Sequence, residues 1–142
     1  MGQIKCSIGE LPSVLQRELD NYGLRVANGV KQVNDDVSKQ FLNDTKISAP
    51  RGRRGKFARS FRIKKVIETP NAKTNVWHVI NRQHSLTHLI IHGHRIVNQF
   101  GPQRNRKTGS KMTRANDFIT PNLEKLDRNY ERGIERVIAN ER

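Results

Sequence analysis

The chain has 142 residues, 34% of them hydrophobic, a single cysteine and a formal net charge of +14. This length predicts one domain with a small core. The lone thiol, Cys6, excludes an internal disulfide and fits a reducing compartment. Because no apolar run approaches the ~20 residues of a membrane span and no signal pattern opens the chain, we expect a soluble protein made in a cytoplasm, with no membrane contact.

The positive charge is concentrated in the middle of the chain. Residues 1–46 carry six basic and six acidic side chains, and residues 117–142 carry five and six. Residues 47–116 carry sixteen basic side chains and one acid, Glu68. A chain charged only for solubility would not segregate its charge in this way. The middle is therefore expected to meet a negative partner, either nucleic acid or an acidic face of another protein copy.

The first periodic segment predicts a helix from about residue 10 to about residue 45, with Pro12 in its first turn. Its apolar stripe, in steps of three and four, consists of Leu15, Leu19, Tyr22, Val26, Val30, Val33, Val37 and Phe41. Gly23 and Gly29 are weak points inside it. At about 1.5 Å per residue the helix exceeds ~50 Å. Two interpretations of this length stay open: the helix overhangs its own domain, or its stripe packs on a neighbouring subunit.

A basic loop follows. The Ala49-Pro50 step ends the helix, because the residue before a proline is pushed out of the α region. The segment 51–56 then places four cations and two glycines in six residues, which predicts a flexible loop. Its cations are Arg51, Arg53, Arg54 and Lys56.

An antiparallel hairpin is predicted next. Residues 60–67 alternate like a half-buried strand. The apolar face would hold Phe61, Ile63 and Ile67, and the outer face Arg62 and Lys64. Residues 69–73 predict a turn, and residues 76–80 predict a second strand that is apolar on both faces.

The last third of the chain alternates between helices and a basic arm. A helix is predicted from His84 to His92, with Gly93 as its cap. Residues 95–100 and 111–114 each fit a strand, and the segment between them contains no apolar residue, which predicts a mobile arm. Its cations include Arg104, Arg106, Lys107 and Lys111. Thr120, as N-cap, and Pro121, at the first helical position, then open a final helix, whose stripe is Leu123, Leu126, Tyr130, Ile134 and Val137.

Enzyme and metal chemistry are weakly indicated. The histidines at 84, 88 and 92 have the spacing of one helix face, with His94 nearby, but no cysteine or carboxylate accompanies them as a zinc ligand. We expect them to cap backbone groups and to line an interface, with no metal and no cofactor. The acids of the terminal helices alternate with bases, which is typical of an ion-paired solvated face. Neither a P-loop nor a nucleophile elbow is present, so no enzyme is expected.

Nucleic-acid binding is a second function that the basic loops could serve. If both basic loops reached phosphates, the affinity would fall steeply with salt. However, only Phe57 and Phe61 interleave with the first cluster, and neither cluster belongs to a helix-turn-helix or an RNA-binding strand motif. A sequence-nonspecific DNA-binding protein acting through its central loops remains the alternative function.

One constellation carries a resemblance to a known family. It comprises Pro50, the segment Gly55–Ser60, Trp77, the core Leu86-Thr87-His88-Leu89 with Gly93-His94, and the step Asp117–Pro121. In this order it resembles the small tail-completion, or head-to-tail joining, proteins of long-tailed bacteriophages, often described as minor tail components. Two departures stand out. Ile91 replaces a glutamate usual in that core, and Asp117 stands where a histidine is expected.

The resemblance implies an α+β fold, in which a small antiparallel sheet is flanked by a long N-terminal helix, a short central helix and a C-terminal helix. It implies one head–tail joining domain over residues 1–142, with basic loops at 51–56 and 95–116. It further implies a homo-oligomeric ring in the virion, with six-fold symmetry expected, assembled in the host cytoplasm. That ring would complete the tail, contact the head connector and the tail tube, and let DNA pass through its centre.

Overall fold

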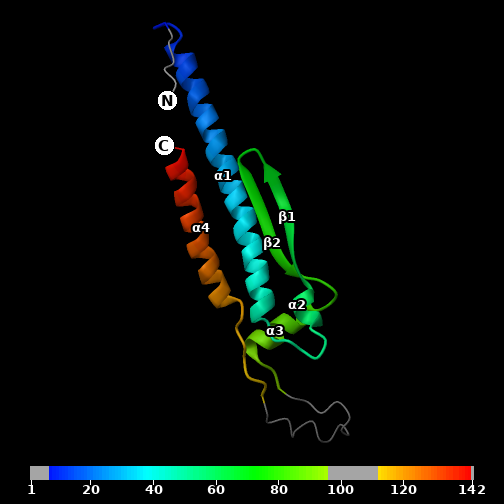
Figure 1. Ribbon diagram of the computed structural model, residues 1–142. Coiled ribbons are helices and arrows are strands. Elements are labelled where there is room, and N and C mark those ends of the chain that lie inside the picture. The colour runs from blue at the N-terminus through cyan, green and yellow to red at the C-terminus, as the bar shows by residue number, and fades with distance from the viewer. Residues whose placement is uncertain (1–6, 96–111, 142) are drawn as a thin grey trace, which may run out of the picture.

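The computed structural model describes residues 7–95 and 112–141, so Cys6 and most of the predicted arm lie outside it. A long helix, α1, lies between a C-terminal helix, α4, and a two-stranded hairpin, and two short helices gather at its lower end (Figure 1). In chain order the elements are α1 (Leu11–Ser48), α2 (Lys56–Arg59), β1 (Phe61–Thr69), β2 (Ala72–Val79), α3 (His84–His92) and α4 (Thr120–Asn140). The predicted α+β class is confirmed.

Helix α1 is the element on which the other elements pack. It begins with Pro12 in its first turn and ends where Ala49 adopts an extended conformation before Pro50. Its 38 residues correspond to about 57 Å, against about 32 Å for the 21 residues of α4. The two helices run antiparallel, and an ion pair of 2.7 Å between Arg25 and Glu141 marks the end of α4 along α1. The first turns of α1 therefore extend beyond α4 (Figure 1).

Two glycines bring α1 and α4 into close contact. A Cβ atom at Gly29 would lie 2.6 Å from Val137 Cγ1, and a Cβ atom at Gly133 would overlap Val33 Cγ1. Each valine therefore packs directly on the backbone of the facing helix, at a density that leaves no room for a methyl group. The sequence analysis identified Gly29 as a residue that lowers the stability of the helix. In the structure, the absence of a side chain at Gly29 lets Val137 pack there.

The hairpin contains a register shift that the alternating pattern did not predict. Phe61 pairs with Val79 and Ile63 with Trp77, which places these four side chains on one face. A bulge between Lys65 and Ile67 then adds one residue to β1, and one extra residue moves all later side chains to the opposite face.

The placement of Ile67 on the face of Phe61 and Ile63 is therefore wrong. Ile67 pairs with Thr74 instead, and Glu68 pairs with Lys73. Lys73 lies on the side that faces α1, where it contacts Asp35. Ile67 consequently lies on the outer face of the hairpin, where it is 49% exposed.

Polar contacts hold the hairpin against α1. Lys73 forms an ion pair with Asp35, and Asn75 donates hydrogen bonds to the carboxylate of Asp35 and to Ser38 Oγ. The hydrogen bonds from Lys73 and Asn75 hold the pKa of Asp35 below its usual value. The hairpin thus packs on a side of α1 that combines these polar groups with Phe41, whose ring lies 6.1 Å from that of Trp77. The valines that meet α4 lie on another side of α1.

An aromatic cluster closes the lower end of the molecule. The ring of Phe61 lies 4.9 Å from those of Phe57 and Trp77, and the ring of Phe118 lies 5.8 Å from those of Phe57 and Phe61. Ala49 completes the buried set. The end of α1, the short helix α2 and the hairpin meet here with the residues before α4, which are distant from them in sequence.

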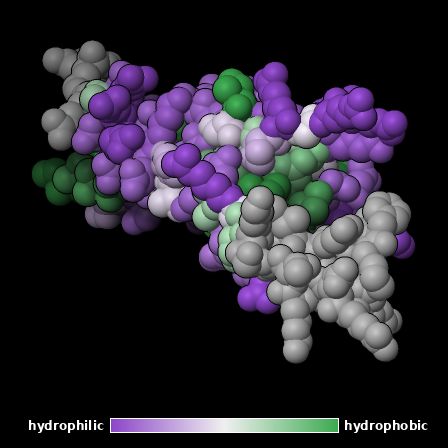
Figure 2. Space-filling view, turned by 90° about the horizontal axis from the view of Figure 1, so that it is seen from below, coloured by the Kyte–Doolittle hydropathy of each residue, from purple (hydrophilic) through white to green (hydrophobic). Residues whose placement is uncertain are grey.

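The described chain leaves much of its apolar surface uncovered. Among residues 7–95 and 112–141, six hydrophobic side chains are buried, whereas fifteen large hydrophobic side chains are exposed. Figure 2 shows hydrophobic residues open to solvent within an otherwise hydrophilic surface. None of the described helices combines the length and the apolarity needed to cross a membrane.

The close contact between α1 and α4 predicts opposite effects for two glycine substitutions in one helix. Gly29→Ala is expected to cost about 1–3 kcal/mol through overpacking against Val137, despite the ~1 kcal/mol by which alanine favours a helix. The control, Gly23→Ala, has nothing within 4 Å of its added methyl group and is expected to leave stability unchanged or raise it. Urea unfolding followed by circular dichroism measures both. Equal effects of the two substitutions would contradict the close contact.

Candidate functional site

The predicted basic loop is a hydrogen-bonded turn. Gly55 N donates to Gly52 O at 3.0 Å, and Gly55 adopts a φ of +58°, which favours glycine. The guanidinium of Arg59 reaches back and donates to the carbonyl oxygens of Arg54 and Gly55. The loop thus has a defined turn geometry, and its flexibility stays a prediction. Its predicted cations, Arg51, Arg53, Arg54 and Lys56, are all exposed, and Lys56 begins α2.

A small groove beside this turn gathers three cations. It measures about 280 Å³, and its charged lining residues are Lys46, Arg51 and Arg59. Of these three residues, the sequence analysis predicted only Arg51 as a site residue, because Lys46 belongs to the end of α1 and Arg59 to α2. A basic residue in the last turn of a helix was the available signal for Lys46. The groove has the charge and size to receive a carboxylate or a phosphate group.

The second basic group, Arg104, Arg106, Lys107 and Lys111, lies outside the described residues. The base of this predicted arm is nevertheless defined. Arg95 and Met112 form an antiparallel bridge, and Thr113 N donates to His94 O at 2.8 Å. Strands were predicted at 95–100 and 111–114. Within the described residues, the pairing is this single bridge. The chain therefore leaves and re-enters the described fold at adjacent points, near α3.

Gly93 and His94, from the family-like motif, build the base of the arm. Gly93 caps α3 with a φ of 72° and a ψ of 163°, a region open essentially to glycine alone. A Cβ atom there would lie 2.6 Å from Thr113 O. His94 N donates to Thr113 Oγ1 at 2.9 Å. These two motif residues therefore act structurally, by bringing residues 113–116 against the end of α3.

The remaining motif residues lie on α3 and at the end of α1. Leu86 and Leu89 are 39% and 38% exposed, whereas Thr87 is partly buried and its hydroxyl group has no hydrogen-bond partner among the described residues. Pro50 is half-buried where α1 ends. The rings of His88 and His92 lie 4.5 Å apart. Within residues 7–95 and 112–141, no cluster of three or more histidine, cysteine or carboxylate side chains is placed to hold a metal ion.

The two departures from the family pattern have distinct structural roles. Ile91 packs against the aromatic cluster. Asp117 Oδ1 accepts hydrogen bonds from the backbone N–H groups of Ile119 and Thr120, at 3.2 and 3.0 Å. Hydrogen bonds from Thr120 hold the pKa of Asp117 below its usual value. The predicted N-cap role of Thr120 is wrong: Thr120 is the first residue of α4, Pro121 follows it, and the carboxylate of Asp117 satisfies the free N–H groups.

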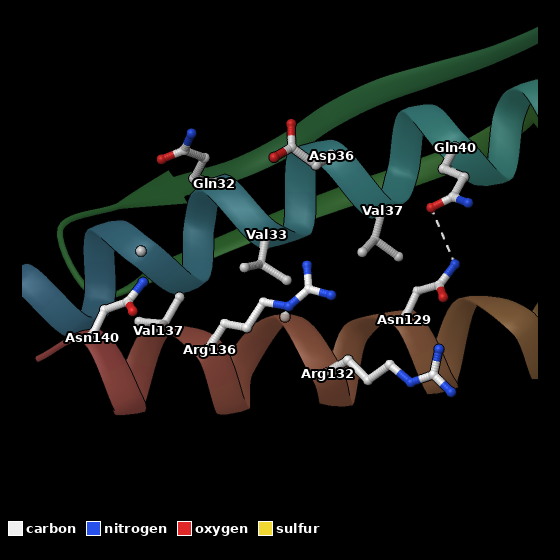
Figure 3. A pocket seen from close by; sticks show the side chains of 12 residues that line it. Gln32, Val33, Asp36, Val37, Gln40, Asn129, Arg132, Arg136, Val137 and Asn140 are labelled. Carbon is white, nitrogen blue, oxygen red and sulfur yellow. Dashed lines mark hydrogen bonds between the residues drawn. The ribbon is translucent and has the colours of Figure 1, made fainter.

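A groove along the seam of α1 and α4 was not predicted. It measures about 470 Å³ and lies beside the close contact between the two helices. Figure 3 shows Arg132 and Arg136 of α4 beside it, with Gln32 and Asp36 on α1. Gln40 and Asn129 join across it by a hydrogen bond of 3.1 Å. Its polar side chains are spread along the seam and form no pairing of a nucleophile with a base.

Comparisons with known proteins identify no relative of the chain. No protein-family model matches it, and searches of curated proteins and of solved structures give no match. The resemblance to phage tail-completion proteins therefore stays a prediction, and the function is argued from the geometry and charge described above.

Gly93 offers a direct test of how residues 113–116 are held against the end of α3. Gly93→Ala is expected to destabilise the fold by about 1–3 kcal/mol, because alanine is strained at this φ and ψ and its methyl group meets Thr113 O. The control, Gly52→Ala, has open space around the added methyl group and should change stability by less than about 0.5 kcal/mol. Amide exchange at Thr113 and Asn116, measured by NMR, should accelerate in the first variant only. Unchanged exchange at these two amides would contradict the contact of residues 113–116 with the end of α3.

The cap of α4 predicts a pH dependence. Because the folded-state pKa of Asp117 lies below its unfolded value, ~3.9, the carboxylate stabilises the fold above that value, and the contribution is lost as pH falls through the folded pKa. Asp117→Asn should therefore lower Tm at pH 7 and match the wild type at the lowest pH. The control, Asp127→Asn, changes an exposed carboxylate of α4. The difference in Tm between this variant and the wild type should not shrink as the pH falls. A Tm difference for Asp117→Asn that is constant from pH 7 to pH 2 would contradict the cap.

Proposed function

We propose that this chain is a structural subunit of a homo-oligomeric ring at the head–tail junction of a long-tailed bacteriophage. One observation carries the proposal: the described chain buries six hydrophobic side chains and exposes fifteen large ones. A monomeric protein gains little stability from so small a core. A subunit whose neighbours cover the open surfaces gains the rest on assembly.

The arrangement of the exposed surfaces supports the same role. The overhanging part of α1 lies at one end of the molecule, and the basic loop, α2 and α3 lie at the other (Figure 1). Each end can therefore contact a different neighbour. The order of the motif along the chain, together with the matching α+β class, connects this subunit to the tail-completion proteins that its sequence resembles.

The positive charge marks the end that would meet adjacent rings. Arg51, Arg53 and Arg54 are exposed on a turn, and single exposed ion pairs contribute only about 0–1 kcal/mol. Repeated around a ring, such weak contacts add through multivalency. The proposed partners are acidic surfaces of the head connector or of the tail tube, with DNA passing through the centre. A role of this kind requires no catalytic group, and it places the protein in the virion after assembly in the host cytoplasm.

The groove lined by Lys46, Arg51 and Arg59 favours sequence-nonspecific DNA binding as the second candidate. Three cations around one groove can hold a backbone phosphate. The two functions differ in solution. A DNA-binding protein shifts duplex DNA with a steep salt dependence and forms no ring, whereas the proposed subunit forms rings or decorates tail ends in negative-stain images.

Reversing the charge of the loop tests the proposal. The triple variant Arg51→Glu, Arg53→Glu, Arg54→Glu should fold, because these side chains are exposed, but it should block head–tail joining. In a phage that lacks its own copy, we expect filled heads and finished tails to accumulate separately, with infectious yield reduced by ~100-fold or more because multivalent contacts are lost together.

The matched control changes the net charge equally at exposed cations elsewhere, through Lys39→Glu, Arg128→Glu and Arg132→Glu. This control should join heads to tails at a yield close to that of the wild type. Normal virion yield from the loop variant would contradict the proposed role of the basic turn.

A further inference from the structure

The overhang of α1, residues 11–24, presents an apolar stripe that α4 does not reach. Four side chains in steps of four, four and three share one helix face: Leu11, Leu15, Leu19 and Tyr22, which are 51%, 58%, 59% and 39% exposed. The stripe continues the side of α1 on which Val33 meets Gly133 of α4. It is therefore a helix-packing surface whose partner is missing from the described part of the chain.

The outer face of the hairpin is a second open surface, and the bulge creates it. Because the register shift turns Ile67 outward, Ile67 lies on the same face as Val76, and the two side chains are 49% and 41% exposed. Arg62 and Lys64 lie on this face as well, since they alternate with Phe61 and Ile63. The face thus combines an aliphatic centre with positive charge.

The two surfaces are complementary in charge and length. Residues 11–24 carry Glu18 and Asp20 against one base, Arg17, and Glu18 lies beside the stripe, three residues after Leu15. The overhang measures about 21 Å along its axis, and the eight residues of β2 measure about 26 Å. Pairing of two overhangs would instead set acid against acid.

We propose that the outer hairpin face of a second copy of this chain covers the overhang of α1. The apolar stripe packs on Ile67 and Val76 of the neighbour, and Glu18, which flanks the stripe, faces the neighbour's Arg62 and Lys64. Because the contact joins two different surfaces, every copy offers one of each, and such heterologous contacts generate rings when the rotation closes. The inference gives the proposed ring its subunit contact and rests on that proposed function only for ring closure.

Variants that each remove one surface test this contact. The helix variant carries Leu15→Glu and Leu19→Glu, and the hairpin variant carries Ile67→Glu and Val76→Glu. All four side chains are exposed, so both variants should fold, which circular dichroism checks. In analytical ultracentrifugation the wild type should associate beyond a dimer as concentration rises, and each variant alone should stay monomeric.

An equimolar mixture of the two variants is the decisive sample. Each variant retains the surface that the other lacks, so the mixture should form a one-to-one dimer and nothing larger. The control, Leu123→Glu with Ile138→Glu on α4, changes side chains of similar exposure and should associate like the wild type.

A second experiment reverses the charges across the proposed contact. Glu18→Arg should weaken association about tenfold, and adding Arg62→Glu with Lys64→Glu should restore it.

Three results would overturn the proposal. A hairpin variant that still dimerises alone would show that overhangs pair with each other. A mixture that stays monomeric would show that the two surfaces do not meet. A wild-type chain that stays monomeric at about 1 mM would show that the affinity between the two surfaces is too low to assemble subunits. If the contact is found but virions assemble without the protein, the contact stands and the head–tail role falls.

Discussion

The reciprocal packing of two valines on two glycines sets the arrangement of the whole molecule. Val137 lies on Gly29 and Val33 lies on Gly133, so α1 and α4 can approach only in one register. That register ends α4 at the level of Arg25 and leaves the first turns of α1 beyond it. The overhang is therefore a fixed consequence of the helix contact, and the open apolar stripe follows from it.

Most of the elements were predictable because they depend on local chemistry. Periodicity predicted α1, α3 and α4, and the Ala49-Pro50 step and Gly93 predicted two helix ends. The bulge in β1 was not predictable, since one added residue leaves the local pattern looking regular and changes only the pairing with β2. The ion pair of Asp35 and Lys73 that docks the hairpin also escaped prediction, because polar residues outside the apolar stripe give no periodic signal.

The candidate site was predictable in charge but not in shape. The exposed cations at 51–54 were found from composition, whereas the groove with Lys46 and Arg59 exists only because α2 folds back against the end of α1. The cap of α4 shows the same limit. Thr120 fits the sequence pattern of an N-cap, but the carboxylate of Asp117 three residues earlier reaches the free N–H groups. The groove depends on tertiary packing, and the cap depends on which of two nearby polar side chains is oriented toward the N–H groups.

The fold describes a subunit with two distinct ends and open apolar faces between them. A basic turn and the bridge between Arg95 and Met112 occupy the end near α2 and α3, and an acidic, apolar helix occupies the other. Such a molecule is suited to repeated lateral contact with its own copies and to a different contact along the axis of an assembly. This division of surfaces is the physical basis for proposing a ring in a virion.

The most direct test of the central claim is amide hydrogen exchange of the full chain as a function of its concentration. If copies cover one another as proposed, residues 11–24 exchange rapidly in the dilute monomer, because no other described element packs on the overhang. They gain protection on association together with the outer face of β1 and β2. The amide groups of Gly29 and Val137, at the contact between α1 and α4, should exchange equally at both concentrations. Protection that appears in neither segment, or in only one of them, would contradict the claim.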